Sequence, residues 1–149
     1  MTPLRTTPAH SEYRRLVRAL DLDLAVTDGD DHAFYAQYNG SDDIEHVVLL
    51  LDGGAALACG ALKPFADRTM EVKRMYTADL ARSRGLAGTV LEELETWAAE
   101  LGCERLVLET GKRQTAALRL YARHGYRRLE ENYGPYACVE NSVCFAKDL

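Results

Sequence analysis

The spacing of hydrophobic residues along the chain alternates between the period of a helix and that of a strand. Four aliphatic residues near the start fall at helical spacing, which predicts a helix over residues 11–26 with Ser11 as its N-cap. Residues 28–31 read DGDD and are turn-like. The segment 32–39, HAFYAQYN, predicts a short second helix that ends at Gly40.

Three strands are predicted in the middle of the chain. The apolar runs HVVLLL (46–51) and AALACGALK (55–63) flank Asp52-Gly53-Gly54, which is a strong hairpin signal. After Pro64 and a polar turn, TMEVKRMYT (69–77) has the β-branched and aromatic content of a third strand. These three strands are expected to form an antiparallel meander.

The second half of the chain returns to helical spacing and then alternates. Apolar residues from Leu86 to Leu101 form one helical stripe, and Gly102 is the expected stop. Further strands are predicted at 104–110, 126–130 and 142–147, and a further helix at 114–125. This order implies an α/β (α+β) fold with a mixed sheet flanked by helices.

Composition narrows the class of protein. The 149 residues are 47% hydrophobic and 28% charged, which fits one soluble domain over 1–149. A net charge of −5 argues against general affinity for nucleic acid or an anionic membrane surface. The longest aliphatic run, Val47–Leu51, is far shorter than the ~20 residues of a membrane span. The N-terminus lacks the apolar core of a signal peptide, so a cytoplasmic protein is expected.

Metal or disulfide chemistry is not expected. The four cysteines, Cys59, Cys103, Cys138 and Cys144, show no CxxC spacing, and the four histidines are equally dispersed. Cys59 and Cys144 are interpreted as buried strand residues. We therefore expect reduced cysteines and no bound metal.

The segment RSRGLAG (82–88) concentrates positive charge and small residues at the start of a helix. Unpaired N–H groups and the helix dipole make such a start an anion site, and Gly85 and Gly88 allow close approach of a phosphate. The alternative is an ordinary solvated helix start. The GxxxxGK[ST] and GxGxxG phosphate motifs are both absent.

The pattern Arg82-x-x-Gly85-x-Ala87 resembles the [Q/R]-x-x-G-x-[G/A] signature of the GCN5-related N-acetyltransferases (GNAT). The resemblance continues through VKRMYT, the helix after RSRGLAG, LVLETGKRQTAALRLYARHGY and YGPYACVENSVCFAKDL, and covers the chain from about residue 46 to the end. These segments resemble one bacterial branch of the family. The sequence departs from that branch at Asp79, where the branch usually has proline, and at Ser83, where it usually has glycine.

The resemblance implies a mixed, mostly antiparallel sheet of about six to seven strands flanked by about four helices. It also implies acetyl-CoA as co-substrate, without a metal. The residues implied in holding acetyl-CoA are Met75, Tyr76, Thr77, Arg82, Ser83, Arg84, Gly85, Leu86, Ala87, Gly88 and Gln114.

Two catalytic residues are implied by the same resemblance. Glu71 stands where the family often has its general base, and the alternative is an exposed glutamate that pairs with Lys73. Tyr121 stands where the family often has a general acid that reaches the CoA sulfur, and the alternative is a core aromatic. His124 is interpreted as a cation at a helix C-terminus.

For the acceptor side, Tyr35, Glu109 and Tyr136 are candidate substrate-binding residues. The leading hypothesis is a cytoplasmic N-acetyltransferase that transfers acetyl from acetyl-CoA directly to a small primary amine in a ternary complex. The alternative is a catalytically inactive acyl-CoA sensor or regulator of the same fold. A homodimer is left open, because many members of the family are dimers.

Overall fold

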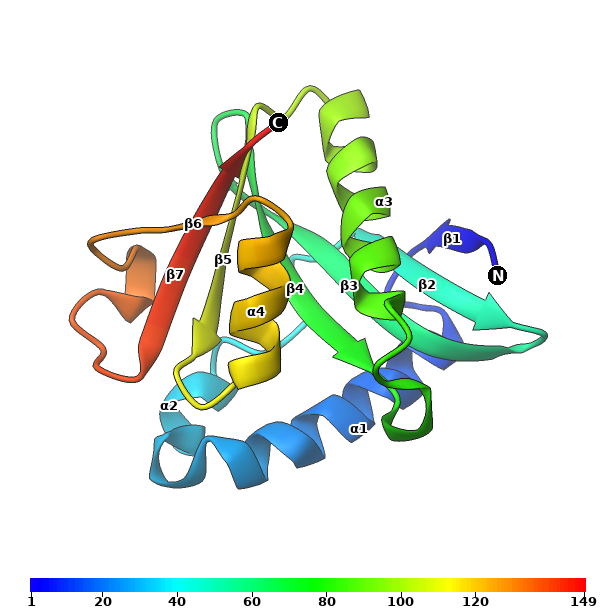
Figure 1. The fold of residues 1–149 in the computed structure, drawn as a ribbon, viewed down its shortest axis with the longest axis horizontal. Coiled ribbons are helices and arrows are strands. Elements are labelled where there is room, and N and C mark those ends of the chain that lie inside the picture. Colours follow the sequence, from blue (N-terminus) through cyan, green and yellow to red (C-terminus); the bar gives the residue numbers. More distant parts are fainter.

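The computed structural model describes residues 1–149 as a seven-stranded sheet with helices on both faces (Figure 1). The strands are β1 (Pro3–Thr6), β2 (His46–Asp52), β3 (Ala55–Ala66), β4 (Thr69–Thr77), β5 (Arg105–Gly111), β6 (Arg127–Arg128) and β7 (Ser142–Asp148), in the order β1-β2-β3-β4-β5-β7-β6. The helices are α1 (Ser11–Thr27), α2 (His32–Ala36), α3 (Leu86–Glu100) and α4 (Thr115–Arg123), with short 3-10 turns at Gly29–Asp31, Asp79–Ala81 and Gly134–Tyr136. The expected mixed, mostly antiparallel sheet is confirmed.

Two hydrophobic clusters hold the helices against opposite faces of the sheet. On one face, apolar residues of α3 and α4, including Leu94 and Tyr121, pack with strand residues such as Leu62 and Leu106. On the other face, α1 contributes Tyr13 and Leu16 to a second cluster. No helix combines the length and the apolar composition that a membrane span requires.

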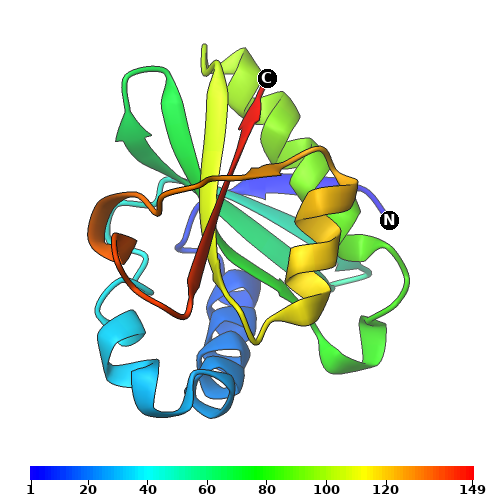
Figure 2. The ribbon, with the colours of Figure 1, turned by 60° about the vertical axis from the view of Figure 1, so that its left-hand side comes forward.

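The sheet is split between its two central strands. β4 and β5 form the only parallel pair, and they pair only at Thr69–Glu71 with Arg105–Val107. Beyond these residues the strands diverge, and α1 and α2 lie near the open end of the split (Figures 1 and 2). The backbone groups of β4 that face the split beyond Glu71 therefore have no strand partner, and they can bind a ligand instead.

A bulge interrupts β4 inside the split. The register with β3 shifts so that Ala61 pairs with Lys73 but Cys59 pairs with Tyr76, which leaves an extra residue on β4. Arg74 carries the strain, with a positive φ of 58°. The consecutive residues Lys73 and Arg74, on either side of the point where the register shifts, both line the same cavity.

The predicted elements are found, with five differences. The short helix predicted over 32–39 with its stop at Gly40 ends already at Ala36. The N-cap of α1 is His10, whose Nδ1 accepts a hydrogen bond of 3.1 Å from the Glu12 amide, and Ser11 is the first helical residue. Strand β1 was not predicted, because a four-residue edge strand shows too little alternation. Strand β3 continues through Pro64, which lies beyond the residues that pair with β2 and so interrupts no hydrogen bond there. The predicted strand 126–130 contracts to β6.

Gly60 lets α3 approach the centre of the sheet. A Cβ atom at this position would lie 2.5 Å from Met75 Sδ and 2.9 Å from both Leu94 Cδ1 and Val90 Cγ1. We expect Gly60→Ala to lower the free energy of unfolding by about 1–3 kcal/mol, because the packed side chains must shift. Urea unfolding would measure the loss.

The control is Gly40→Ala, because a Cβ at Gly40 meets no atom within 4 Å. Equal stability of the two variants would show that α3 does not depend on close approach at Gly60.

Candidate active site

A cleft of about 1000 Å³ runs between the end of β4, the start of α3 and the inner side of α4. Of the residues expected to hold acetyl-CoA, ten line this cleft: Met75, Tyr76, Thr77, Arg82, Ser83, Gly85, Leu86, Ala87, Gly88 and Gln114. Arg84 is exposed and does not line it. The cleft also reaches Leu24 and Thr27 of α1, on the opposite wall.

The start of α3 presents its backbone to the cleft. Ser83 and Gly85 have positive φ values of 64° and 76°, and Gly85 is the N-cap. The next three N–H groups, of Leu86, Ala87 and Gly88, belong to the first helical turn and have no acceptor inside the helix. Unpaired N–H groups at a helix start can bind an anion such as a pyrophosphate.

The Arg82 side chain is already engaged. Its guanidinium pairs with Asp23 at 3.0 Å and with Asp79 at 2.9 Å, and its Nε donates to the Thr77 carbonyl at 3.1 Å. These contacts connect the turn before α3 to α1. Arg82 therefore shapes the cleft wall, while the positive field at the helix start comes chiefly from the backbone.

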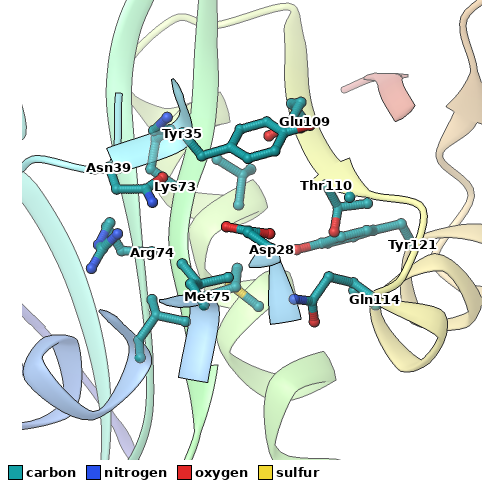
Figure 3. Close-up of a pocket in the computed structure, with 15 residues that line it drawn as sticks. Asp28, Tyr35, Asn39, Lys73, Arg74, Met75, Glu109, Thr110, Gln114 and Tyr121 are labelled. Atoms are coloured by element: carbon teal, nitrogen blue, oxygen red, sulfur yellow. The ribbon is translucent and has the colours of Figure 1, made fainter. Parts of the chain in front are cut away.

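A second, smaller cavity of about 140 Å³ lies inside the split of the sheet. It shares Met75, Gln114 and Tyr121 with the cleft, so the two spaces meet at these side chains. Figure 3 shows β4 residues on one side of the cavity, β5 and α4 residues on the other, and Asp28 between them. A thioester bound in the cleft would reach an acceptor in the cavity at this junction.

Glu109 is the carboxyl group of β5 that lines the cavity. Its Oε2 is buried and has no hydrogen-bond partner. Burial raises the pKa of Glu109 to about 7, with smaller contributions from the Asp28 and Glu71 carboxylates, while Ser142 and Lys73 oppose the shift. A carboxyl with this pKa can accept a proton near neutral pH and release it again.

Glu71 lies on β4 next to the cavity but does not line it. It is 6% exposed, so the alternative of an exposed glutamate is wrong. The Tyr133 hydroxyl donates a hydrogen bond of 2.6 Å to its Oε2. One oxygen of Glu71 is thus occupied by a protein donor.

Tyr121 is 6% exposed and lies where the cleft and the cavity meet. Its hydroxyl end points into the cavity (Figure 3). Burial raises the pKa of Tyr121, so the hydroxyl keeps its proton at neutral pH. Its ring also packs against Tyr126 and Phe145, as the alternative of a core aromatic predicted. The role of general acid stays a prediction.

Neither buried cysteine is poised as a nucleophile. Both Cys59 and Cys144 are buried strand residues, as predicted, and all four cysteines are free. Burial raises the pKa of the Cys59 thiol to about 12 and that of Cys144 to about 11. Both thiols are therefore protonated at neutral pH, whereas covalent catalysis requires a thiolate.

The two candidate tyrosines for the acceptor side form one aromatic wall. Tyr35 lines the cavity, and its hydroxyl shares a 2.7 Å hydrogen bond with Ser142. Tyr136 stacks on Tyr35 with ring centroids 6.4 Å apart, outside the cavity lining. Its hydroxyl accepts a hydrogen bond of 3.3 Å from Lys73 Nζ, so Tyr136 contacts the cavity through that lysine.

Three charged residues of the cavity were not predicted as site residues: Asp28, Lys73 and Arg74. Asp28 is 5% exposed, and burial raises its pKa, while His32 and Arg113 oppose the shift. Of the neighbouring acids, Asp30 is exposed and Asp31 pairs with Arg113 at 3.5 Å. A bulge and a turn decide which of these side chains face inward, and no local sequence signal reveals either.

The split sheet, with a helix start above a long cleft and a small polar cavity beside it, is the architecture of an N-acetyltransferase that uses acyl-CoA. The model of the Acetyltransferase (GNAT) family matches residues 11–126. The chain belongs to this family.

Individual relatives agree with this assignment. An IAA acetyltransferase of Azospirillum brasilense is 29% identical over 153 residues, covering 100% of this chain and 98% of that protein. The uncharacterised N-acetyltransferase YsnE of Bacillus subtilis is 35% identical over 100 residues, and the match covers 66% of each chain.

Solved structures share the fold. One assigned as an acyl-CoA N-acyltransferase, from Klebsiella pneumoniae, gives a TM-score of 0.83 at 29% identity and covers 99% of this chain and 97% of its own. A GNAT family acetyltransferase of Elizabethkingia anophelis with acetyl-CoA bound gives 0.72 at 21% identity, covering 99% and 97%.

Proposed function

We propose that the protein transfers an acetyl group from acetyl-CoA to the primary amine of a small molecule, directly and in a ternary complex. The observation that carries this proposal is the junction of the two spaces at Met75, Gln114 and Tyr121. The cleft would hold the CoA moiety, and the cavity would hold the acceptor. Placing both reactants side by side removes much of the entropic barrier to reaction.

Glu109 is the preferred general base of this proposal. A typical alkylammonium has a pKa of about 10.4, so a carboxyl that titrates near 7 receives its proton more readily than an ordinary glutamate would. Glu71, the general base implied by the family resemblance, is the second candidate. Its route to the amine would pass through a water molecule or through Lys73, because Glu71 does not line the cavity.

The proposed reaction then proceeds in balanced steps. Glu109 takes a proton from the ammonium group, and the free amine attacks the thioester carbonyl to form a C–N bond. The C–S bond breaks as Tyr121 protonates the departing thiolate, and the second proton of the nitrogen restores the Tyr121 hydroxyl. Glu109 releases the first proton to solvent, which returns both residues to their starting state. Backbone N–H groups of β4 at Met75 or Tyr76, beside the split, would stabilise the negative oxygen.

An activity screen tests the proposal. The protein would be incubated with acetyl-CoA and amino acids, polyamines, aminoglycosides or peptides, and release of the CoA thiol would be measured. Binding of acetyl-CoA would be followed separately as a rise in the unfolding temperature. Turnover with any amine supports the enzyme, whereas binding without turnover supports a CoA-responsive regulator.

We expect Tyr121→Phe to lower kcat by roughly 10-fold and to leave acetyl-CoA affinity unchanged. The loss is smaller than the roughly 10²–10⁴-fold typical of a general acid, because a thiolate with a pKa of about 8.5 also leaves unassisted. Stopped-flow thiol release and calorimetric titration would measure the two quantities.

Tyr126→Phe is the matched control for this variant. The Tyr126 hydroxyl is buried against α3, where it donates a hydrogen bond of 2.8 Å to Glu95. Its removal should lower stability but not kcat. If the two variants lose kcat equally, Tyr121 acts through packing alone.

A further inference from the structure

We infer that the acceptor carries a carboxylate as well as an amine, so that its class is that of small amino acids. The inference rests on the proposed function and assigns a role to the charged cavity residues that the reaction itself does not use. One side of the cavity offers hydrogen-bond donors, and the other side offers the base (Figure 3).

The donor side is built by the bulge in β4. Arg74 has a side chain that is only 2% exposed, and its Nη2 donates to Asp21 at 2.5 Å. Its Nε is buried and makes no hydrogen bond to the protein. An unpaired guanidinium N–H is costly in a buried site, and an anionic oxygen is its best partner.

Lys73 lies beside Arg74 on the same wall. Its ammonium has one protein acceptor, the Tyr136 hydroxyl at 3.3 Å, although an ammonium has three N–H donors. Burial lowers the pKa of Lys73, while Glu71 and Glu109 oppose the shift. A carboxylate bound next to it would stabilise the charged form, and the Asn39 side chain adds a neutral donor to this wall.

The acidic side of the cavity faces these donors. Glu109 lies on the β5 wall, and Asp28 lies between the two walls (Figure 3). An ammonium group near Glu109 and a carboxylate near Lys73 and Arg74 would satisfy both sides together. A simple alkylamine would leave the buried donors without a partner, which a binding site penalises strongly.

The space between the two walls also bears on the acceptor. The cavity has a volume of about 140 Å³ and meets the cleft at Met75, Gln114 and Tyr121. A small amino acid suits this space, because its ammonium and carboxylate groups would match the two walls. The two charges therefore point to one chemical class.

The test compares each amino acid with its amide, which keeps the amine and the shape but lacks the negative charge. Alanine with alaninamide, and 4-aminobutyrate with 4-aminobutyramide, form suitable pairs. We expect kcat/KM to favour the carboxylate member by at least roughly 10-fold, chiefly through KM. Arg74→Gln and Lys73→Met should each reduce this ratio toward one without changing the KM for acetyl-CoA.

Arg105→Gln is the matched control, because Arg105 pairs with Asp148 at 3.1 Å at the far end of β5 from Glu109. It should keep the wild-type ratio. A second measurement does not require turnover: propionate, in the presence of CoA, should raise the unfolding temperature of the wild type but not that of Arg74→Gln.

The outcomes separate the two proposals. Equal turnover of acids and amides, or a ratio unchanged in both Arg74→Gln and Lys73→Met, would overturn the inference and leave the acetyltransferase intact. If no amine is acetylated while acetyl-CoA binds, the proposed function fails. The propionate measurement then decides the carboxylate site on its own.

Discussion

Glu109→Gln is expected to lower kcat/KM for the acceptor by roughly 10²–10⁴-fold, the range typical of a lost general base. The base must be ionised to accept a proton, and the folded protein holds the pKa of Glu109 at about 7. Wild-type kcat/KM should therefore rise as the pH increases through about 7. This rising limb of the pH–rate profile should disappear in the variant. A pH–rate profile between pH 5.5 and 9 measures both effects.

Glu71→Gln is the comparison that decides between the two carboxyls. With Glu109 as the base, Glu71→Gln lowers kcat/KM but keeps the limb near pH 7. If Glu71→Gln removes the limb and Glu109→Gln keeps it, the assignment to Glu109 is wrong and the prediction made from the sequence is right.

The raised pKa of Glu109 should also make the free energy of unfolding depend on pH. A carboxyl whose pKa is higher in the folded state binds its proton more tightly there, so stability decreases as the pH rises from its ordinary value of 4.5 to about 7. Glu109→Gln removes this loss. Relative to the wild type, the variant should therefore gain stability over this pH window, as urea unfolding at several pH values would measure.

Gly85→Val is expected to weaken acetyl-CoA binding by roughly 100-fold. Gly85 has a φ of 76°, a conformation that costs a β-branched residue about 1–3 kcal/mol, so the first turn of α3 must rearrange. The N–H groups of Leu86, Ala87 and Gly88 would then lose their common direction. Two charge-assisted hydrogen bonds at about 1.5 kcal/mol each account for the expected loss. Calorimetric titration with CoA measures the affinity.

Gly102→Val controls for strain in the same helix. Gly102 has a similar φ of 92° just after the C-terminal end of α3, and a Cβ there meets no atom within 4 Å. This variant should lose stability and keep its affinity. Arg84→Ala should weaken binding only a few-fold, because Arg84 lies outside the cleft lining. A greater loss in Arg84→Ala than in Gly85→Val would show that side-chain charge holds the phosphates.

Local sequence signals were sufficient to predict most of the helices and strands. Asp52-Gly53-Gly54 identified the hairpin because a two-residue turn needs residues that tolerate positive φ, and Gly53 has a φ of 63°. The apolar stripe from Leu86 onward predicted α3 because it covers one side of a helix. The same kind of local signal marked the helix start at 82–88, where consecutive backbone groups form the anion site themselves.

The proposed acceptor cavity could not be predicted from the sequence in the same way, because its walls come from distant parts of the chain. Sequence and family resemblance supplied three candidates: a carboxyl on β4, a tyrosine on α4 and a glutamate on β5. Which carboxyl faces the cavity depends on where β4 and β5 stop pairing, and that point is set by tertiary packing.

The sequence by itself thus determined the class of fold and the position of the proposed CoA cleft, because both follow from contiguous patterns. Only the tertiary structure decided the inner chemistry. At the bulge in β4, the neighbouring cations Lys73 and Arg74 both line one cavity. The split of the sheet places Glu109 at the same cavity, whereas Glu71 accepts a hydrogen bond from Tyr133. Burial then sets the pKa of Glu109, and burial is a property of the assembled fold.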